Sequence, residues 1–263
     1  AASSVTLYGT ADVGYEKFTG TGLQQTGNDD SNFGIKGEED LGNGLSAIFK
    51  MESRLNLDTG TQARSRFFER ESWVGLKGNF GTVRFGRSKA ALERALGDYN
   101  PGNRVATIWD PYSGNSSSRH DNSMFYDYDN GGFNIGANVT TKGGANEVGN
   151  VTTVDGTTVL GAGASNGLEG SKGSKVGFGV HASYAGNITN TVGYSVAAAY
   201  QKDGTKPGVN LNGKGREWGV GAQVNFKPVS VGGSYADYKN GSYKDRTWGA
   251  YIAADVTAND SLY

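Results

Sequence analysis

Residues 217–227 read EWGVGAQVNFK, in which every even position from Trp218 to Phe226 is apolar and every odd position is polar or glycine. Because successive side chains of a β-strand point to opposite faces, this alternation predicts a strand with one apolar and one polar face. The two aromatic ends are eight residues apart, which is about 26 Å along the strand, or about 19 Å along a membrane normal at a tilt of ~45°. This spacing is typical of the aromatic girdles that bracket the apolar band of a transmembrane β-barrel.

The same alternation repeats along the chain, and the segments between the predicted strands have two lengths. Short turns are predicted near 40–44, 78–80, 130–131, 186–190 and 227–228. Long polar segments are predicted near 19–30, 56–66, 88–119, 142–174, 203–213 and 240–244. Short turns at one end and long loops at the other indicate a barrel with periplasmic turns and external loops. We therefore expect one domain over residues 1–263, an all-β transmembrane antiparallel β-barrel with about twelve strands in this chain.

The two ends of the chain decide how such a sheet could close. The first strand is predicted over Val5–Tyr15 and the last over Asp245–Val256, after which a turn and the short stub 261–263 follow. Bacterial barrels of this kind have an even number of strands, and a stub after a turn is typical of the start of another strand. We therefore expect C-terminal strands of the barrel to be missing from this sequence. The alternative is a small barrel of about twelve strands with a short tail.

Composition excludes several classes of protein. The chain has no cysteine, which removes disulfide frameworks, thiolate metal sites and cysteine nucleophiles. Its 25 basic and 26 acidic residues give a net charge of −1, which argues against nucleic-acid binding through bulk charge. A mean hydropathy of −0.51 is too polar for a bundle of membrane helices, but it suits a barrel in which half of each strand faces water.

The sequence offers one grouping that could suggest catalysis, His120 with Asp121 and Ser123. His120 and Ser123 are three residues apart in a predicted strand, so they are expected on opposite faces, where they cannot share a hydrogen bond. His181 is isolated, and no cluster of histidine and acidic residues has the spacing of metal ligands. We therefore expect a protein that is not an enzyme and that holds no cofactor and no metal.

Four motifs stand out in the first half of the chain. They are SVTLYG at 4–9 with Asp12, FGIKGEEDLG at 33–42, FERESWVGL at 68–76 and FGTVRFGR at 80–87. Together with RHDNS at 119–123, they resemble the general diffusion porins of Gram-negative bacteria, most closely the β-proteobacterial and neisserial type. The resemblance implies homotrimers of 16-stranded barrels in the cell outer membrane, in contact with its lipid. It also implies passage of inorganic ions and small hydrophilic solutes through a water-filled pore.

The resemblance further implies a constriction of the pore. In this family the third long loop folds into the lumen, and the corresponding segment 88–119 carries the acidic residues Glu93, Asp98 and Asp110. An acidic loop opposite a basic wall would produce a transverse field across the narrowest water, so that bore and charge together select what passes.

Basic residues are predicted on the wall that faces this loop. Parity with the apolar positions turns six of them toward the pore: Lys36, Lys50, Arg54, Arg70, Arg84 and Arg119. Of these, Arg70 and Arg119 match positions that supply wall arginines in the family. Asn32 stands where many relatives carry a wall arginine, so the anion preference that the resemblance implies is expected to be weak.

Two other functions would fit a barrel of this kind. A surface adhesin or scaffold would bind through 142–174 and leave 88–119 outside, whereas a channel folds 88–119 inward. A substrate-specific channel would show aromatic side chains along the lumen, whereas the inward positions here are mostly glycine, small polar residues and charges. We therefore expect an outer-membrane porin that allows passive diffusion.

Overall fold

The protein forms one large antiparallel sheet. The computed structural model describes residues 3–27, 31–63, 66–99, 116, 118–141, 151–152, 158–159, 176–202 and 215–254. Twelve strands follow one another in the order β1-β4-β5-β7-β8-β9-β10-β13-β14-β15-β16-β17, and the short β6 (Thr61–Gln62) pairs with β5. Their bounds are β1 Ser3–Thr10, β4 Asn32–Gly42, β5 Leu45–Asn56, β7 Glu71–Gly78, β8 Gly81–Lys89, β9 Arg119–Asn130, β10 Phe133–Thr140, β13 Phe178–Asn187, β14 Gly193–Lys202, β15 Arg216–Phe226, β16 Val229–Asn240 and β17 Tyr243–Ala254. The prediction of an all-β fold with about twelve strands in this chain is confirmed.

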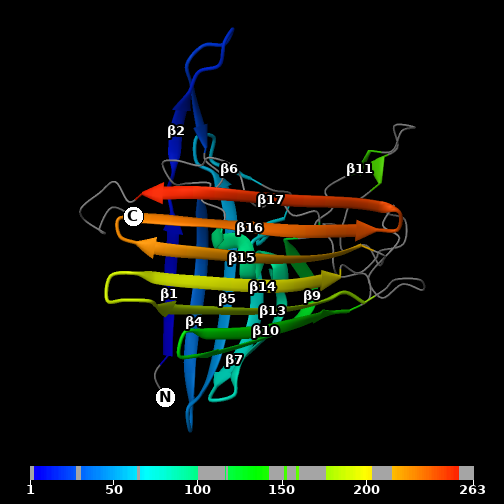
Figure 1. Cartoon of the computed structure of the whole chain (residues 1–263). Coiled ribbons are helices and arrows are strands. Elements are labelled where there is room, and N and C mark those ends of the chain that lie inside the picture. Colours follow the sequence, from blue (N-terminus) through cyan, green and yellow to red (C-terminus); the bar gives the residue numbers. More distant parts are fainter. Residues whose placement is uncertain are drawn as a thin grey trace.

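The sheet is strongly coiled. In Figure 1 the blue strands β1, β4 and β5 run across the direction of the yellow-to-red strands β13 to β17. Coiling of this kind arises because each strand is rotated in the same sense relative to its neighbour, and the rotation accumulates over many strands. The two edges of the sheet are β1, which pairs with β4, and β17, which pairs with β16.

Each strand presents one exposed apolar face, as the alternation predicts. On β15, Trp218 is 44% exposed and Val220 is 42% exposed, whereas Glu217 on the opposite face is 1% exposed. The register continues the apolar face across the sheet, since Val220 pairs with Ala198 on β14 and with Tyr235 on β16. The exposed apolar face is the outer surface of the coil, and the opposite face is its inner surface.

The predicted short turns join the expected strands. Between β4 and β5 the backbone reverses at Asn43, which has a φ of 54° between two glycines that also have positive φ. Asparagine and glycine tolerate this left-handed conformation better than other residues. One predicted long segment is wrong, because 240–244 is a tight turn in which only Gly241 and Ser242 separate β16 from β17.

The first strand differs from the prediction. A single strand was expected over Val5–Tyr15, but β1 ends at Thr10, and β2 (Val13–Glu16) forms a separate hairpin with β3 (Gln24–Gly27). The cause lies at Asp12, whose backbone N–H donates to Ser31 Oγ at 2.9 Å and whose carbonyl accepts from the same hydroxyl at 2.7 Å. A side chain therefore satisfies the backbone groups that would have continued the ladder to β4.

Two short helical segments follow β8, namely α1 (Ala91–Leu96) and the 3₁₀ turn η1 (Gly97–Tyr99), and another small hairpin is formed by β11 (Val151–Thr152) and β12 (Thr158–Val159). No helix among the described residues is long and apolar enough to cross a membrane. The predicted C-terminal stub 261–263 lies outside the described residues.

The facing of the strands predicts how two neighbouring positions respond to the same charge. Ala182 lies on the apolar face of β13 between Ile135 and Ala198, whereas Ser183 lies on the inner face beside Asn134. We expect Ala182→Arg to reduce the free energy of unfolding in liposomes by about 2–4 kcal/mol, because the charge meets hydrocarbon. Ser183→Arg serves as the control and should fold almost as well as the parent. Equal losses at the two positions would contradict this assignment of faces.

Candidate pore constriction

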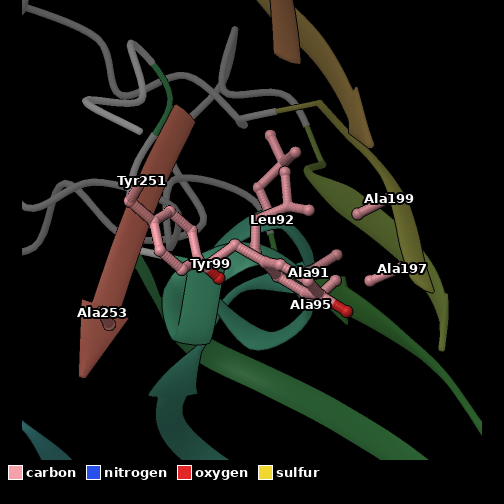
Figure 2. Close-up of a cluster of buried hydrophobic side chains, with 9 residues drawn as sticks. Ala91, Leu92, Ala95, Tyr99, Ala197, Ala199, Tyr251 and Ala253 are labelled. Carbon is pink, nitrogen blue, oxygen red and sulfur yellow. The ribbon is translucent and has the colours of Figure 1, made fainter. Parts of the chain in front are cut away.

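The segment after β8 packs against the inner face of strands that are far away in the sequence. Figure 2 shows α1 and η1 beside the strands that carry Ala197, Ala199, Tyr251 and Ala253. The buried cluster consists of Ala91, Leu92, Ala95, Leu96, Tyr99, Ala197, Ala199, Tyr251 and Ala253. The wall members of this cluster alternate with exposed residues such as Val196 and Ile252, so the helix lies on the side opposite the apolar stripe. The predicted inward fold of 88–119 is therefore present in its described part.

Glycines in the wall allow this close approach. A Cβ atom placed on Gly219 would lie 2.5 Å from Leu96 Cδ1 and 3.1 Å from the Tyr235 carbonyl oxygen. At Gly221 the corresponding atom would lie 2.9 Å from Tyr99 Cγ. Real Cβ atoms essentially never approach other atoms within 3.0 Å, so a side chain at either position would force Leu96 or Tyr99 to shift.

Hydrogen bonds attach both ends of the inward segment to the same wall. Near its start, the Leu92 N–H donates to Gln201 Oε1 at 3.2 Å, and the Tyr99 hydroxyl donates to Ser195 Oγ at 3.0 Å. Near its end, the Ser116 backbone N–H and hydroxyl donate to Glu217 Oε2 at 2.9 and 2.5 Å. Since β8 and β9 flank the segment, its described residues near both ends reach from these strands to β14 and β15.

Glu52 on β5 collects two of the predicted wall bases. Arg70 Nε donates to Glu52 Oε1 at 2.5 Å, and Lys50 Nζ lies 3.5 Å from Glu52 Oε2. The Tyr8 hydroxyl donates to the same carboxylate at 2.5 Å. Lys36 extends over the ring of Tyr8, with Nζ 5.2 Å from the ring centroid. Glu52 thus has Lys50 and Arg70 beside it on the inner face, and Lys36 lies over the neighbouring Tyr8.

Asp127 on β9 is the centre of a second cluster. Arg84 Nη2 lies 2.7 Å from Asp127 Oδ2, while Arg94 Nε and His181 Nε2 lie 3.2 and 3.3 Å from Oδ1. Arg84 also donates to Ser88 Oγ at 2.6 Å. Because Arg94 belongs to α1, this carboxylate joins the helical segment to β9, in addition to its contacts with β14 and β15. The described part of the inward segment is therefore attached to the wall at β9, β14 and β15.

The remaining predicted wall bases are held within the wall. Arg54 Nε lies 3.5 Å from Glu69 Oε1, and Arg119 Nε donates to the Arg70 carbonyl oxygen at 2.8 Å. Among the predicted loop acids, Glu93 on α1 is partly buried and Asp98 in η1 is exposed. Asp110 lies outside the described residues. The structure thus brings Lys50 together with Arg70, and Arg70 together with Arg119, but the described loop acids do not join these clusters.

Several residues of the lumen were not predicted from the sequence. Arg94 on the loop and the acids Glu69 and Asp127 were not predicted, whereas parity does turn Glu52 toward the pore together with Lys50 and Arg54. Aromatic rings are also present, since Arg84 Cζ lies 5.3 Å from the Trp73 centroid and 5.1 Å from the Phe125 centroid. The parity argument could have found these positions, because Trp73 and Phe125 directly neighbour the exposed Val74 and Met124.

His120 and Ser123 also differ from the prediction. Asn122 has a φ of 49°, and the pairing of β9 with β8 gains an extra residue there, so that both residues face the inner side. They nevertheless have separate partners. Ser123 donates to the Asp121 carbonyl oxygen at 2.8 Å, and the His120 nitrogens lie 2.9 and 3.3 Å from the amide nitrogens of Asn138 and Gln201. Within the described residues, no group of three or more histidine and acidic side chains could hold a metal ion.

A comparison with known protein families identifies the family of this chain. The family model of the Gram-negative porins matches residues 1–262. The chain belongs to the Gram-negative porin family. Its relatives in Neisseria meningitidis and Delftia acidovorans are named as outer membrane proteins. This porin is likewise a protein of the outer membrane of a Gram-negative bacterium.

Individual relatives agree with this porin over different parts of its length. The major outer membrane protein P.IB of Neisseria meningitidis (serogroup A, serotype 4A) is 41% identical over 115 residues, which are 38% of this chain and 33% of that protein. The match to this curated relative thus spans about a third of its length. An anion-selective porin from Comamonas acidovorans has a TM-score of 0.50 at 24% identity, and it covers 98% of this chain and 86% of its own. The trimer form of OmpT from Vibrio cholerae has a TM-score of 0.50 at 14% identity, with the same two coverages. These two solved structures show that this chain shares the porin fold.

The contact between Gly219 and Leu96 predicts an energetic coupling between wall and loop in this porin. We expect Gly219→Ala to destabilise it by about 1–3 kcal/mol through overpacking and Leu96→Ala by about 2–5 kcal/mol through a cavity. In the double variant the new methyl group occupies part of that cavity, so the loss should be smaller than the sum by at least about 0.5 kcal/mol. Urea unfolding in micelles measures all three.

Gly193→Ala provides the matched control for this cycle. A Cβ atom at Gly193 would meet its nearest neighbour, Asn187 Oδ1, only at 3.4 Å. Its effect should therefore simply add to that of Leu96→Ala. If Gly219→Ala also adds without coupling, the helix does not rest on this glycine.

Proposed function

We propose that this porin allows passive diffusion of inorganic ions and small hydrophilic solutes through a water-filled pore, and that it performs no enzymatic reaction. The proposal takes residues 1–263 as a single barrel domain in which 88–119 narrows the pore. The observation that carries it is the attachment of α1 and η1 to the inner face through Gly219, Gly221 and Asp127. A segment held there narrows the water-filled interior, whereas a surface adhesin would gain nothing from it.

The described lumen also favours general diffusion over a substrate-specific channel. Three of the described inner aromatic rings are in contact with cations, since Lys36 lies over Tyr8 and Arg84 lies against Trp73 and Phe125. They therefore do not present the bare aromatic track along which a specific solute could slide. Charged groups around water select mainly by size and sign of charge.

Charge pairing supports only a weak anion preference. Glu52, Glu69 and Asp127 offset Arg70, Arg54 and Arg84, so part of the positive charge on the described inner face is neutralised. The related porin from Comamonas acidovorans is anion-selective. For this chain we propose a preference of the same sign but reduced size, with Lys36, Lys50, Arg54, Arg70, Arg84 and Arg119 as the wall cations and Glu93, Asp98 and Asp110 as the loop anions.

Assembly as a homotrimer in outer-membrane lipid completes the proposal. It rests on membership of the porin family and on the fold shared with OmpT of Vibrio cholerae, for which a trimer form is known. Native mass spectrometry of the protein extracted from the membrane tests it. A particle with the mass of a single chain would contradict it.

Opposite charges of the Glu52 cluster should shift ion selectivity in opposite directions. We expect Arg70→Ser to move the reversal potential in a planar bilayer toward cation preference and Glu52→Gln to move it toward anion preference. Both shifts should shrink as salt is raised, because the Debye length is about 10 Å at 0.1 M and about 3 Å at 1 M. Asp98→Asn on the exposed side of η1 should shift the potential in the same direction as Glu52→Gln.

Lys227→Gln, in the exposed turn between β15 and β16, is the control and should leave the reversal potential unchanged. If the channel still conducts and none of Arg70→Ser, Glu52→Gln and Asp98→Asn moves the potential, the selecting charges lie elsewhere. If no variant and no parent protein conducts, the proposal of a diffusion pore fails as a whole.

A further inference from the structure

Uncharged polar side chains form a ledge on the inner face of β14 to β17. The ledge consists of Ser195, Gln223, Asn225, Ser230 and Tyr251. Ser195 opposes Gln223 across β14 and β15, and Asn225 opposes Ser230 across β15 and β16. Because directly opposed residues of antiparallel strands have Cβ atoms about 4.5–5.5 Å apart, these side chains form one continuous surface.

Hydrogen bonds fix how the side chains of the ledge are turned. The ring of Tyr251 lies against Gly232, and its hydroxyl donates across β16 to Gln223 Oε1. Gln223 Nε2 in turn donates to Asn225 Oδ1 at 2.6 Å, and Ser230 Oγ donates to the same oxygen at 2.7 Å. Both amides are therefore oriented, and the Asn225 nitrogen is turned away from the two groups that bond to its oxygen.

Asn225 presents unused donors to the lumen. Within the described part of the chain no hydrogen bond involves its Nδ2, and this nitrogen is not one of the buried side-chain atoms that lack a partner. Because Asn225 is only half-buried, Nδ2 is open to water. An amide nitrogen can donate two hydrogen bonds, and successive hydrogen bonds in a chain polarise one another. The chain that starts at the Tyr251 hydroxyl thus ends in a fixed pair of donors.

The ledge borders the segment that narrows the pore. Tyr99 of η1 meets the wall at Gly221, where a Cβ atom would lie 2.9 Å from its ring, and its hydroxyl donates to Ser195 Oγ at 3.0 Å. Gln223 and Asn225 occupy the next two inward positions after Gly221, about 7 and 13 Å further along β15. A solute that passes η1 on this side therefore moves directly along the ledge.

The wall around the ledge is uncharged. Between the level of Gly221 and the turn at 227–228, none of the described inward positions of β14 to β17 carries a charged side chain. The charged clusters of the lumen, with Lys50, Arg84 and Asp127, belong to β5, β8 and β9. A neutral wall attracts ions of neither sign over a distance, whereas a polyhydroxylated solute can exchange hydrogen bonds with water for hydrogen bonds with fixed amides and hydroxyls.

We propose that the ledge is a binding site for small uncharged polyhydroxylated solutes, such as monosaccharides and linear polyols, on their way through the pore. The Asn225 amide donates to a hydroxyl oxygen of the solute. Ser230, which donates to Asn225, keeps lone pairs that accept from a neighbouring hydroxyl of the same solute. The inference rests on the proposed function as a diffusion pore, and it names the class of solute that the uncharged part of the wall favours.

Ribose is the probe that tests this proposal. Its uptake into proteoliposomes is measured for the parent and for Asn225→Leu, which has a similar side-chain volume but no amide. Loss of one neutral hydrogen bond weakens binding about two- to tenfold, so uptake at low ribose concentration should fall by that factor. Uptake by the parent should saturate as ribose is raised, whereas uptake by the variant should stay closer to linear. Linear uptake by the parent, with no difference from the variant, would overturn the proposal.

Matched controls separate binding from a change of bore. Triethylene glycol has the same molecular mass as ribose but only two hydroxyl groups, and its uptake should be equal in the parent and in Asn225→Leu. Asn134→Leu makes the same exchange on the inner face of β10, where the amide donates to Asp129 at 2.6 Å, and it should leave ribose uptake unchanged. If Asn225→Leu slows both solutes equally, or if Asn134→Leu slows ribose as much, the ledge does not bind the sugar and the proposal is wrong.

A second variant and ion conductance complete the test. Asn225→Ala also removes the amide but adds no apolar bulk, so it tests the same contact if the leucine variant does not fold, and it should show the same loss of ribose uptake. Both variants should conduct ions in a planar bilayer as the parent does, because the ledge carries no charge. If the parent conducts and ribose uptake does not depend on residue 225, the ledge proposal is wrong while the diffusion pore stands. If the parent neither conducts ions nor takes up ribose, the proposed function fails as well.

Discussion

Every polar group of the backbone has to find a partner when a chain crosses hydrocarbon, and this constraint underlies the whole molecule. The ladders that run from β1 through the sheet to β17 satisfy it for the strands between these two edges, each of which pairs with a neighbour on both sides. Once the backbone is committed to extended strands, side chains alternate with a period of two. The outer face can then be apolar and the inner face polar within a chain whose mean hydropathy is negative. The turns, the aromatic girdle and the wet interior all follow from that division.

The inner face of the sheet is mostly polar, and it nevertheless holds a short helical segment. Apolar contact is confined to a small cluster, in which Leu92 and Leu96 meet alanines and glycines of β14 and β15. Electrostatic contacts also hold the helix, since Asp127 joins Arg94 of the helix to Arg84 and His181 of the wall. Small residues of β14 and β15 and the shared carboxylate of β9 together hold the described part of the segment against the wall.

Much of this architecture could be predicted from the sequence, since alternation is a local property that any strand displays. The stripe from Trp218 to Phe226, the turn at Asn43 and the inward fold after β8 followed from pattern and resemblance. Other features depend on contacts across the fold. The hydroxyl of Ser31 ends β1 by bonding Asp12, and the extra residue at Asn122 turns His120 inward. The pairing of wall acids with wall bases depends on register, which parity alone does not give.

The attachments of the helical segment also constrain the order in which the strands and this segment can fold. Leu92 bonds to Gln201 and Ser116 bonds to Glu217, partners that are 109 and 101 residues away in the chain. Contacts of such long range form late, because the chain entropy of the intervening loop is lost before they are gained. The strands that carry Gln201 and Glu217 must therefore be in place before the segment has a wall to rest on. A sheet without β14 and β15 would therefore lack the wall against which this segment is held.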